Sequence, residues 1–330
     1  MRRIDVNLVL LLLGAAALWV LPAGFGNYGI YVLSLWLVTA VAAMGLNLTL
    51  GYAGQVSLAQ AAFLGIGAYA TALMTAKLGL PWWLAFSASG LLCFVIGIGL
   101  GVPALRVQHH YLAFVTLAFA TVVHLVARNE QWLTGGVYGL ANIPRPAVFG
   151  DRLNGNLVFY RFVLAVTLLL ALVQWWILRS PWGRAFQALR ENPLRAASLG
   201  VDVRLYTLLA FALGAAYGGF AGALYAPLVE FIDPAPFALS QSLMLLLMVI
   251  AGGAGYFLSP FLGALVGVAL PEWLRFTGGA YLLFFAGAVM ALLVVSPQGL
   301  MGLADRAIQA VKDRRRRPEP LPAPQPSEGR

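Results

Sequence analysis

Long apolar runs separated by short polar segments make up most of this chain. A helix needs about 20 apolar residues to cross the roughly 30 Å hydrocarbon core of a bilayer. Ten segments approach or exceed that length, and the last but one falls furthest below it: 8–22, 28–50, 61–76, 82–105, 111–127, 160–178, 205–229, 237–251, 259–271 and 279–295. We therefore predict an all-α, polytopic bundle of about ten membrane spans with broken, glycine-rich segments.

The composition supports a membrane protein and excludes several other classes. Of the 330 residues, 61% are apolar and 10% are charged, whereas about 25% are charged in soluble domains. Disordered chains have the opposite balance, so disorder is excluded for most of the sequence. The single cysteine, Cys93, excludes a disulfide framework and a multi-cysteine metal site held by this chain alone.

The positions of the basic residues predict the orientation. With the N-terminus inside and ten crossings, 15 of the 21 Lys and Arg residues fall on the inner side and 6 on the outer side. Cytoplasmic loops carry this excess, so both termini are expected in the cytoplasm. Arg2 and Arg3 before an apolar run also fit a signal peptide, but no convincing cleavage site follows, so an uncleaved first span is favoured.

The chain divides into a membrane domain, 1–304, and a tail, 305–330. The tail holds five prolines between 318 and 326 and four consecutive arginines at 314–317. Such a segment cannot bury a core, so we expect a flexible, cytoplasmic tail whose arginines lie near anionic headgroups. The remaining basic residues are spread between apolar runs rather than gathered on one domain, so no nucleic acid is expected as a partner.

Motifs of enzymes and of nucleotide-binding proteins are missing from the sequence. Neither of the two lysines, Lys77 and Lys312, follows a glycine as in a phosphate-binding loop, and no catalytic triad or metalloprotease motif is present. His124 is the one candidate for a proton relay at membrane depth, although a histidine that bonds within the bundle is the more ordinary interpretation. His109 and His110 are adjacent and diverge on a helix, so they do not form a metal site. We expect no catalytic residue, metal or cofactor in this chain, and energy from ATP would have to come from a partner.

Two glycine-rich segments interrupt the apolar runs, one in each half of the chain. Irregular backbone at membrane depth survives only where protein or a water-filled cavity satisfies it, and paired breaks point to a solute path. The alternative is that the glycines only allow close helix packing, as we also expect for Gly97, Gly99 and Gly101. The candidate path residues are Gly51, Gly54, Gln55, Ser57, Gln60, Gly252, Gly253 and Gly255.

A charged segment, 179–204, separates two spans on the predicted inner side. Gly183 and Pro193 indicate two short helices with a break, and each helix carries an apolar i, i+3 pair: Phe186 with Leu189, and Ala196 with Leu199. Each pair could enter a groove on a partner protein. The alternative is a basic loop that only fixes orientation.

Three stretches together resemble a known family. Residues 45–74 (GLNLTLGYAGQVSLAQAAFLGIGAYATALM), 183–203 (GRAFQALRENPLRAASLGVDV) and 252–264 (GGAGYFLSPFLGA) resemble the branched-chain amino acid ABC transporter permeases, specifically the M-type subunit. The similarity runs from about residue 35 to residue 302, so 1–304 is expected to be a permease domain.

The resemblance implies a multi-pass subunit of an importer in the bacterial inner membrane. Its implied partners are a homologous H-type permease, two ATP-binding subunits that carry ATP and Mg, and a periplasmic binding protein that delivers a branched-chain amino acid. The segment within 179–204 resembles the coupling motif that such permeases insert into a groove on the ATPase. The coupling residues implied are Arg184, Arg190, Glu191, Ala196, Ala197 and Gly200.

The sequence also departs from the family pattern. Ala59 and Gln60 stand where a Gly-His pair is common, Ser259 replaces a glycine, and Arg195 replaces an acidic or small residue. Permeases for urea or short-chain amides resemble the same family, so the solute stays open between these classes. An ion-coupled secondary carrier is a further alternative, although the scarcity of intramembrane acids disfavours it.

Overall fold

The computed structural model describes residues 11, 13–104, 112–148, 151–153, 155–273, 281–296, 298–303, 305 and 306. Within these ranges the chain is helical apart from loops and one small hairpin. The predicted tail lies outside the described residues beyond Arg306, as do His109 and His110.

The elements follow one another in a simple order. Residues 13–20 are helical and lead into η1 (Leu21–Gly24), α2 (Asn27–Leu46) and the π-helical η2 (Asn47–Tyr52). The remaining elements are α3 (Gln60–Ala72), η3 (Leu73–Lys77), α4 (Trp82–Ala104), α5 (Leu112–Asn129), α6 (Gln131–Thr134), η5 (Gly136–Tyr138), β1 (Ala147–Val148), β2 (Asp151–Arg152), α7 (Asn156–Arg179), α8 (Pro181–Glu191), α9 (Pro193–Ser198), α10 (Val203–Val229), η6 (Ala235–Phe237), α11 (Leu239–Gly252), α12 (Ser259–Trp273) and α13 (Tyr281–Val295).

The helices confirm the predicted membrane bundle in outline. Helix is present in each of the ten predicted segments, as far as the structure describes them. Among the residues that the structure describes, five helices are long and apolar enough to cross a bilayer: α2 with η2, α4, α5, α7 and α10. Helix α11 is apolar but shorter. The count of ten crossings and the side on which the termini lie stay predictions.

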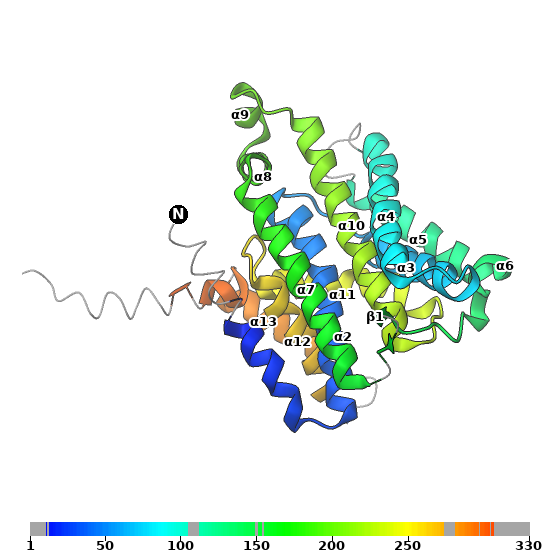
Figure 1. The fold of residues 1–330 in the computed structure, drawn as a ribbon. Coiled ribbons are helices and arrows are strands. Elements are labelled where there is room, and N and C mark those ends of the chain that lie inside the picture. The colour runs from blue at the N-terminus through cyan, green and yellow to red at the C-terminus, as the bar shows by residue number, and fades with distance from the viewer. Residues whose placement is uncertain are drawn as a thin grey trace, which may run out of the picture.

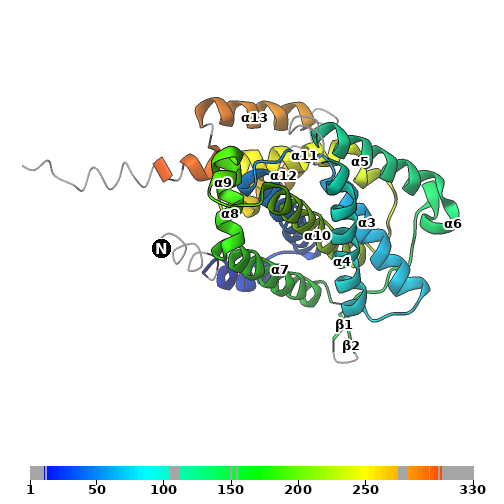
Figure 2. The ribbon, with the colours of Figure 1, turned by 90° about the horizontal axis from the view of Figure 1, so that it is seen from above.

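Helix α10 lies at the centre of the bundle. Figure 2 shows it inside the ring of helices, where it packs along α2, α3 and α4. Of its apolar window 78% is buried, against 22% for α5 at the edge. Glycines allow α10 to approach α3 closely. A methyl group at Gly222 would overlap the backbone of Leu64, and one at Gly67 would overlap that of Gly219. The backbones of α3 and α10 are therefore in direct contact.

Helices α8 and α9 form one end of the bundle, beyond the ends of α7 and α10 (Figure 1). The opposite end holds the segments that follow α5 and α10. Leu140 and Ile232 exchange two backbone hydrogen bonds of 2.8 and 2.9 Å, and Arg145 forms an ion pair of 2.7 Å with Glu230. These contacts join the long polar stretch after α5 to the end of the central helix.

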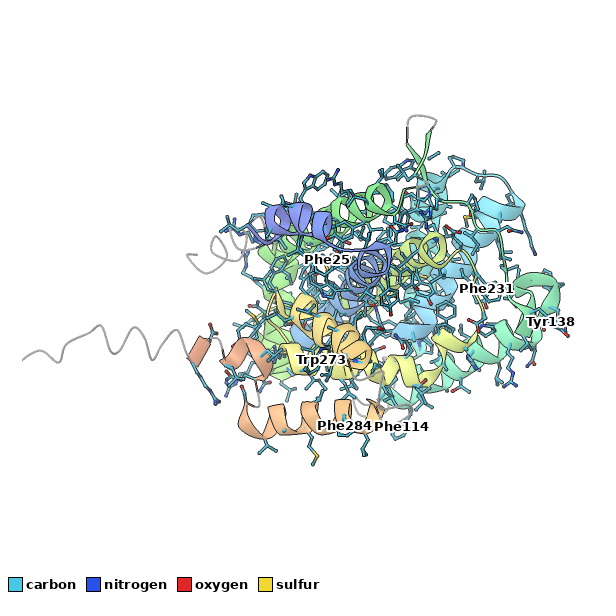
Figure 3. All side chains as sticks on the ribbon, turned by 90° about the horizontal axis from the view of Figure 1, so that it is seen from below. Phe25, Phe114, Tyr138, Phe231, Trp273 and Phe284 are labelled. Atoms are coloured by element: carbon cyan, nitrogen blue, oxygen red, sulfur yellow. The ribbon has the colours of Figure 1, made fainter. Side chains whose placement is uncertain are left out.

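Large apolar side chains cover much of the outer surface. Phe25, Phe114, Tyr138, Phe231, Trp273 and Phe284 are exposed on different elements (Figure 3). An apolar exterior of this kind is expected where lipid tails rather than water surround the helices.

Candidate functional site: a coupling face, a glycine junction and a cavity

Three polar caps divide the segment 179–204 into separate helices. Ser180 accepts a hydrogen bond from the Trp182 amide at the start of α8, and Asn192 accepts one from the Arg195 amide at the start of α9. Asp202 caps α10 in the same way. Each side-chain oxygen satisfies a backbone donor that has no partner within its helix. The two predicted short helices are confirmed.

Of the two residues that indicated the break, Pro193 marks it and Gly183 does not. Gly183 lies inside α8, where a methyl group would overlap the backbone of Leu178 at the end of α7. The glycine is therefore needed for close approach of the two helices. The break lies at Asn192, whose extended backbone separates α8 from α9.

The apolar face of α8 contacts this chain rather than a partner, contrary to the prediction. Phe186 is fully buried and Leu189 is 4% exposed. The Phe186 ring packs edge-on against Tyr206 of α10, with ring centroids 6.4 Å apart. The face of α8 that carries these side chains thus anchors the segment to its own bundle.

Another set of side chains remains available to a partner. Leu194 and Leu199 of the α9 region are 83% and 82% exposed. We use the term coupling face for the exposed residues Arg184, Glu191, Leu194, Ala197, Leu199 and Gly200. Of the predicted coupling residues, Ala196 is buried at 2% exposure, and Arg190 is exposed but its guanidinium contacts the bundle, as described next.

Arg190 joins the end of α8 to both glycine-rich segments. Its guanidinium donates a hydrogen bond to the carbonyl oxygen of Gly51. A methyl group at Gly255 would overlap the same guanidinium, and one at Gly54 would lie 3.3 Å from the Arg190 Cα atom. Because Gly54 and Gly255 have no Cβ atom, the Arg190 side chain fits between the two glycine-rich segments.

The two breaks also contact each other through a buried asparagine. The Asn47 side chain donates a 2.9 Å hydrogen bond to the Tyr256 carbonyl and accepts one of 2.9 Å from the Gly255 amide. Asn47 is completely buried. We call the assembly of Asn47, Gly51, Gly54, Gly255 and Arg190 the glycine junction. The sequence paired the two breaks, but it did not single out Asn47.

The three polar residues predicted to line the path lie inside protein contacts. Gln60 donates hydrogen bonds of 2.9 and 3.2 Å to the carbonyls of Ala42 and Gly214. Gln55 donates one of 3.0 Å to Thr207, and Ser57 accepts one of 3.3 Å from the Ala59 amide at the start of α3. All three are at most 3% exposed. These bonds hold the break against α2 and α10, and a role toward a solute stays a prediction.

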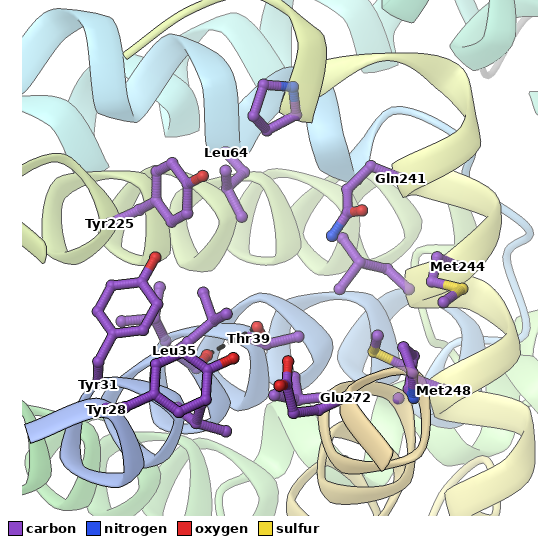
Figure 4. A pocket seen from close by; sticks show the side chains of 17 residues that line it. Tyr28, Tyr31, Leu35, Thr39, Leu64, Tyr225, Gln241, Met244, Met248 and Glu272 are labelled. Atoms are coloured by element: carbon purple, nitrogen blue, oxygen red, sulfur yellow. Dashed lines mark hydrogen bonds between the residues drawn. The ribbon is translucent and has the colours of Figure 1, made fainter. Parts of the chain in front are cut away.

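A cavity of about 470 Å³ lies among α2, α10, α11 and α12 (Figure 4). Apolar side chains supply most of its wall. Tyr28, Tyr31 and Tyr225 present aromatic rings with hydroxyl groups, and the polar residues Thr39, Gln241 and Glu272 complete the lining. None of the predicted path residues belongs to this lining.

No group of three or more His, Cys, Asp or Glu side chains suitable for a metal occurs in the part of the chain that the structure describes. His124 is half-buried on α5, and its Nδ1 atom has no hydrogen-bond partner among the described residues.

Comparison with known proteins identifies the family. The sequence profile described as "Branched-chain amino acid transport system / permease component" matches residues 28–294, a range that includes the glycine junction, the cavity and the coupling face. The chain belongs to this permease family.

Relatives within the family carry permease names. The chain is 33% identical to the high-affinity branched-chain amino acid transport system permease protein LivM of Escherichia coli K12, over 88% of this chain and 73% of the relative. It is 30% identical to the probable LivM of Methanocaldococcus jannaschii, over 52% of this chain and 50% of the relative. The autoinducer 2 import system permease protein LsrC of Klebsiella pneumoniae is 30% identical over 53% of each chain. No solved structure matches this permease.

Proposed function

We propose that this permease is the membrane-spanning subunit of an ATP-driven importer that moves branched-chain amino acids across the bacterial inner membrane. The LivM relatives named for this transport, which align over most of the chain, support the solute class. Its proposed partners are a homologous H-type permease, two ATPase subunits that hold ATP and Mg, and a periplasmic binding protein. Both termini and the coupling face lie on the cytoplasmic side in this proposal, with about ten crossings between them.

The observation that carries the proposal is the position of Arg190. The residue belongs to α8, next to the coupling face, and its guanidinium contacts the backbone of both glycine breaks. Movement of α8 and α9 by a partner would therefore displace backbone inside the membrane domain directly. An ATPase that seats Leu194 and Leu199 in a groove could use this connection to switch the bundle between outward and inward access.

Gly200 offers a test of the coupling step. It lies between α9 and α10 with a φ of +85°, and nothing stands within 4 Å of the position of a Cβ atom. Gly200→Glu introduces backbone strain of about 1–2 kcal/mol but no overlap, so the protein should still insert and assemble. We expect the added carboxylate on the coupling face to abolish ATP-dependent leucine uptake in vesicles that contain the complete importer.

The outcomes separate the alternatives. Normal uptake by the Gly200→Glu importer would remove the coupling assignment. Uptake by this chain without ATPase subunits, driven by an ion gradient, would identify a secondary carrier. Binding of urea or a short-chain amide, rather than leucine, isoleucine or valine, by the companion binding protein would assign the other solute class.

A further inference from the structure

Two arginines lie beside the first turns of α7, at the end of the bundle opposite α8 and α9. Arg145 reaches α7 from the preceding loop, and its guanidinium pairs with Glu230 at 2.7 Å and donates a 3.1 Å hydrogen bond to Asn156. Arg161 belongs to α7 itself. Within the described residues its guanidinium forms no ion pair and no hydrogen bond, although its Nε atom is buried. The structure therefore neutralises Arg145 and leaves Arg161 without a counter-ion.

An aromatic ring covers the Arg161 guanidinium. The guanidinium lies 5.2 Å from the centroid of the Trp19 ring, which belongs to the first helix, residues 13–20. Next to this contact, the Tyr160 hydroxyl donates a 3.0 Å hydrogen bond to the Leu18 carbonyl. The first helix is thus fixed against the start of α7. A cation–π contact attracts a guanidinium but supplies no negative charge, so the need for a counter-ion remains.

The position of Arg161 along α7 places its charge at the level of the lipid headgroups. The 24 residues of α7 extend over about 36 Å, which is more than the roughly 30 Å of the hydrocarbon core. Arg161 is about 7.5 Å from Asn156, the first residue of the helix. Helical side chains tilt toward the N-terminus, and long basic side chains extend along apolar surface to place their charge in the polar region.

The surroundings of Arg161 combine hydrogen-bond donors with apolar surface. Arginine and tryptophan side chains carry N–H donors and no acceptor, and the Trp19 indole forms no hydrogen bond within the described residues. Val20, next to Trp19, is 70% exposed, and Val158, which precedes Arg161 by three positions on the same face of α7, is 49% exposed. Both helices lie at the edge of the bundle, the first in dark blue and α7 in green (Figures 1 and 2).

From these observations we infer that Arg161 and Trp19 bind the phosphate group of an anionic phospholipid. Phosphate oxygens accept paired hydrogen bonds from a guanidinium, and the exposed surface of Val20 and Val158 contacts the acyl chains. No described carboxylate pairs with Arg161, so the ammonium group of phosphatidylethanolamine finds no partner there, whereas a lipid with a net negative charge neutralises the arginine. The bound lipid holds the first helix against α7. This inference does not depend on which solute the permease moves.

Removal of the guanidinium tests the site directly. The purified, delipidated importer is titrated with dioleoylphosphatidylglycerol or dioleoylphosphatidylethanolamine, and bound lipid is counted by native mass spectrometry. The wild type should bind one phosphatidylglycerol at least tenfold more tightly than phosphatidylethanolamine, and Arg161→Ala should weaken that binding at least tenfold. The matched control is Arg128→Ala, which removes an exposed arginine from the last turn of α5 at the same end of the bundle. It should bind phosphatidylglycerol like the wild type.

The aromatic ring provides a second test that keeps the charge. Trp19→Leu retains an apolar side chain but removes the ring and its N–H donor, so phosphatidylglycerol binding should weaken at least threefold. Trp176→Leu changes a tryptophan that is 67% exposed near the other end of α7 and should leave this binding unchanged. A lipid that binds only the folded protein stabilises it. Phosphatidylglycerol should therefore raise the unfolding temperature of the wild type more than that of Arg161→Ala.

The outcomes distinguish a lipid from other counter-ions. Equal affinities of the wild type and Arg161→Ala for phosphatidylglycerol would overturn the inference. Displacement of the lipid by millimolar inorganic phosphate would also overturn it, because the site would then recognise free phosphate. Normal lipid binding by Arg161→Ala, together with loss of the leucine uptake that the binding protein supports, would assign the arginine to a carboxylate of that protein instead. A wild-type importer that binds phosphatidylglycerol but transports no branched-chain amino acid would contradict the proposed function and leave the lipid site intact.

Discussion

Arg190, on the last turn of α8, donates a hydrogen bond to the carbonyl oxygen of Gly51, which lies 139 positions earlier in the chain. Gly51 belongs to the π-helical turn η2 that continues α2. The guanidinium therefore donates a hydrogen bond to a carbonyl oxygen in the π-helical end of a membrane helix, where the regular α-helical hydrogen bonds are interrupted. The contact connects the segment proposed to meet the ATPase with the segment proposed to move in transport.

Removing the Arg190 side chain should uncouple ATP hydrolysis from transport. Hydrogen bonds to charged groups contribute about 1.5–3 kcal/mol, and about 1.4 kcal/mol corresponds to a factor of ten. We therefore expect Arg190→Ala to lower the number of leucine molecules moved per ATP at least tenfold while the importer still hydrolyses ATP. Parallel measurements of leucine uptake and phosphate release in the same vesicles give this ratio.

Arg204→Ala is the matched control for loss of one positive charge at the same end of the bundle. Arg204 is exposed at the start of α10, and its backbone amide, not its side chain, bonds to Asp202. The Arg204→Ala importer should move as many leucine molecules per ATP as the wild type. An Arg190→Ala importer with the wild-type ratio would show that the contact with Gly51 does not transmit movement.

Two glycines with the same backbone conformation allow strain and packing to be separated. Gly255 and Gly79 have φ angles of +92° and +63°. Alanine should cost each position about 1–2 kcal/mol through its left-handed backbone, but only at Gly255 would the methyl group displace the Arg190 guanidinium, since nothing stands within 4 Å of a Cβ atom at Gly79. Gly255→Ala should therefore reduce the coupling ratio as Arg190→Ala does, whereas Gly79→Ala should lower thermal stability alone. Equal coupling ratios in the two alanine variants would contradict this account.

The buried bonds of Asn47 should make a large contribution to the stability of the junction. Asn47→Leu keeps a side chain of similar size but leaves the Gly255 amide without its partner, whereas the Tyr256 carbonyl still accepts a hydrogen bond from the Ser259 hydroxyl. Each unsatisfied buried group costs about 1–3 kcal/mol, so thermal unfolding of the purified importer should shift clearly to lower temperature. Thr121→Val is the control, because the exposed Thr121 hydroxyl bonds only to Leu117 within its own helix. An equal shift of the unfolding temperature in both variants would show that the Asn47 hydrogen bonds contribute no more to stability than a hydrogen bond on an exposed helix.

The sequence predicted the positions of the helices well, but it did not predict which helix surfaces contact each other. The apolar runs predicted helices that the structure contains, and the glycine clusters marked both breaks. Helical periodicity showed that α8 has an apolar face at Phe186 and Leu189, but it could not show which neighbour covers that face, and a partner was wrongly chosen. Likewise, Arg190 was predicted as a coupling residue without any sign that it reaches Gly51.

The cavity was missed for a related reason. Met244 and Met248 have the i, i+4 spacing of an ordinary core-facing stripe, and the cavity is lined by residues from elements far apart in the sequence. The predicted apolar segment 259–271 ends immediately before Glu272, which therefore fell outside the predicted helix. In the structure, Pro271 and Glu272 lie within the last turn of α12, which places the carboxylate on the cavity wall.

Two glycines on one helix provide a test of how the bundle is packed. The Gly97 backbone approaches α10 so closely that a Cβ atom would lie 2.9 Å from the Ala215 Cβ atom and 3.0 Å from the Ala212 Cα atom, whereas nothing stands within 4 Å of Gly99. Overpacking costs about 1–3 kcal/mol, so Gly97→Val should reduce thermal stability and the yield of assembled importer. Gly99→Val, the same change two residues away on the opposite face, should have little effect on either. Size-exclusion chromatography and thermal unfolding of the two variants measure the difference. Loss of assembly with Gly99→Val but not with Gly97→Val would contradict this account, because it would place the tight packing on the exposed face of α4 rather than at its contact with α10.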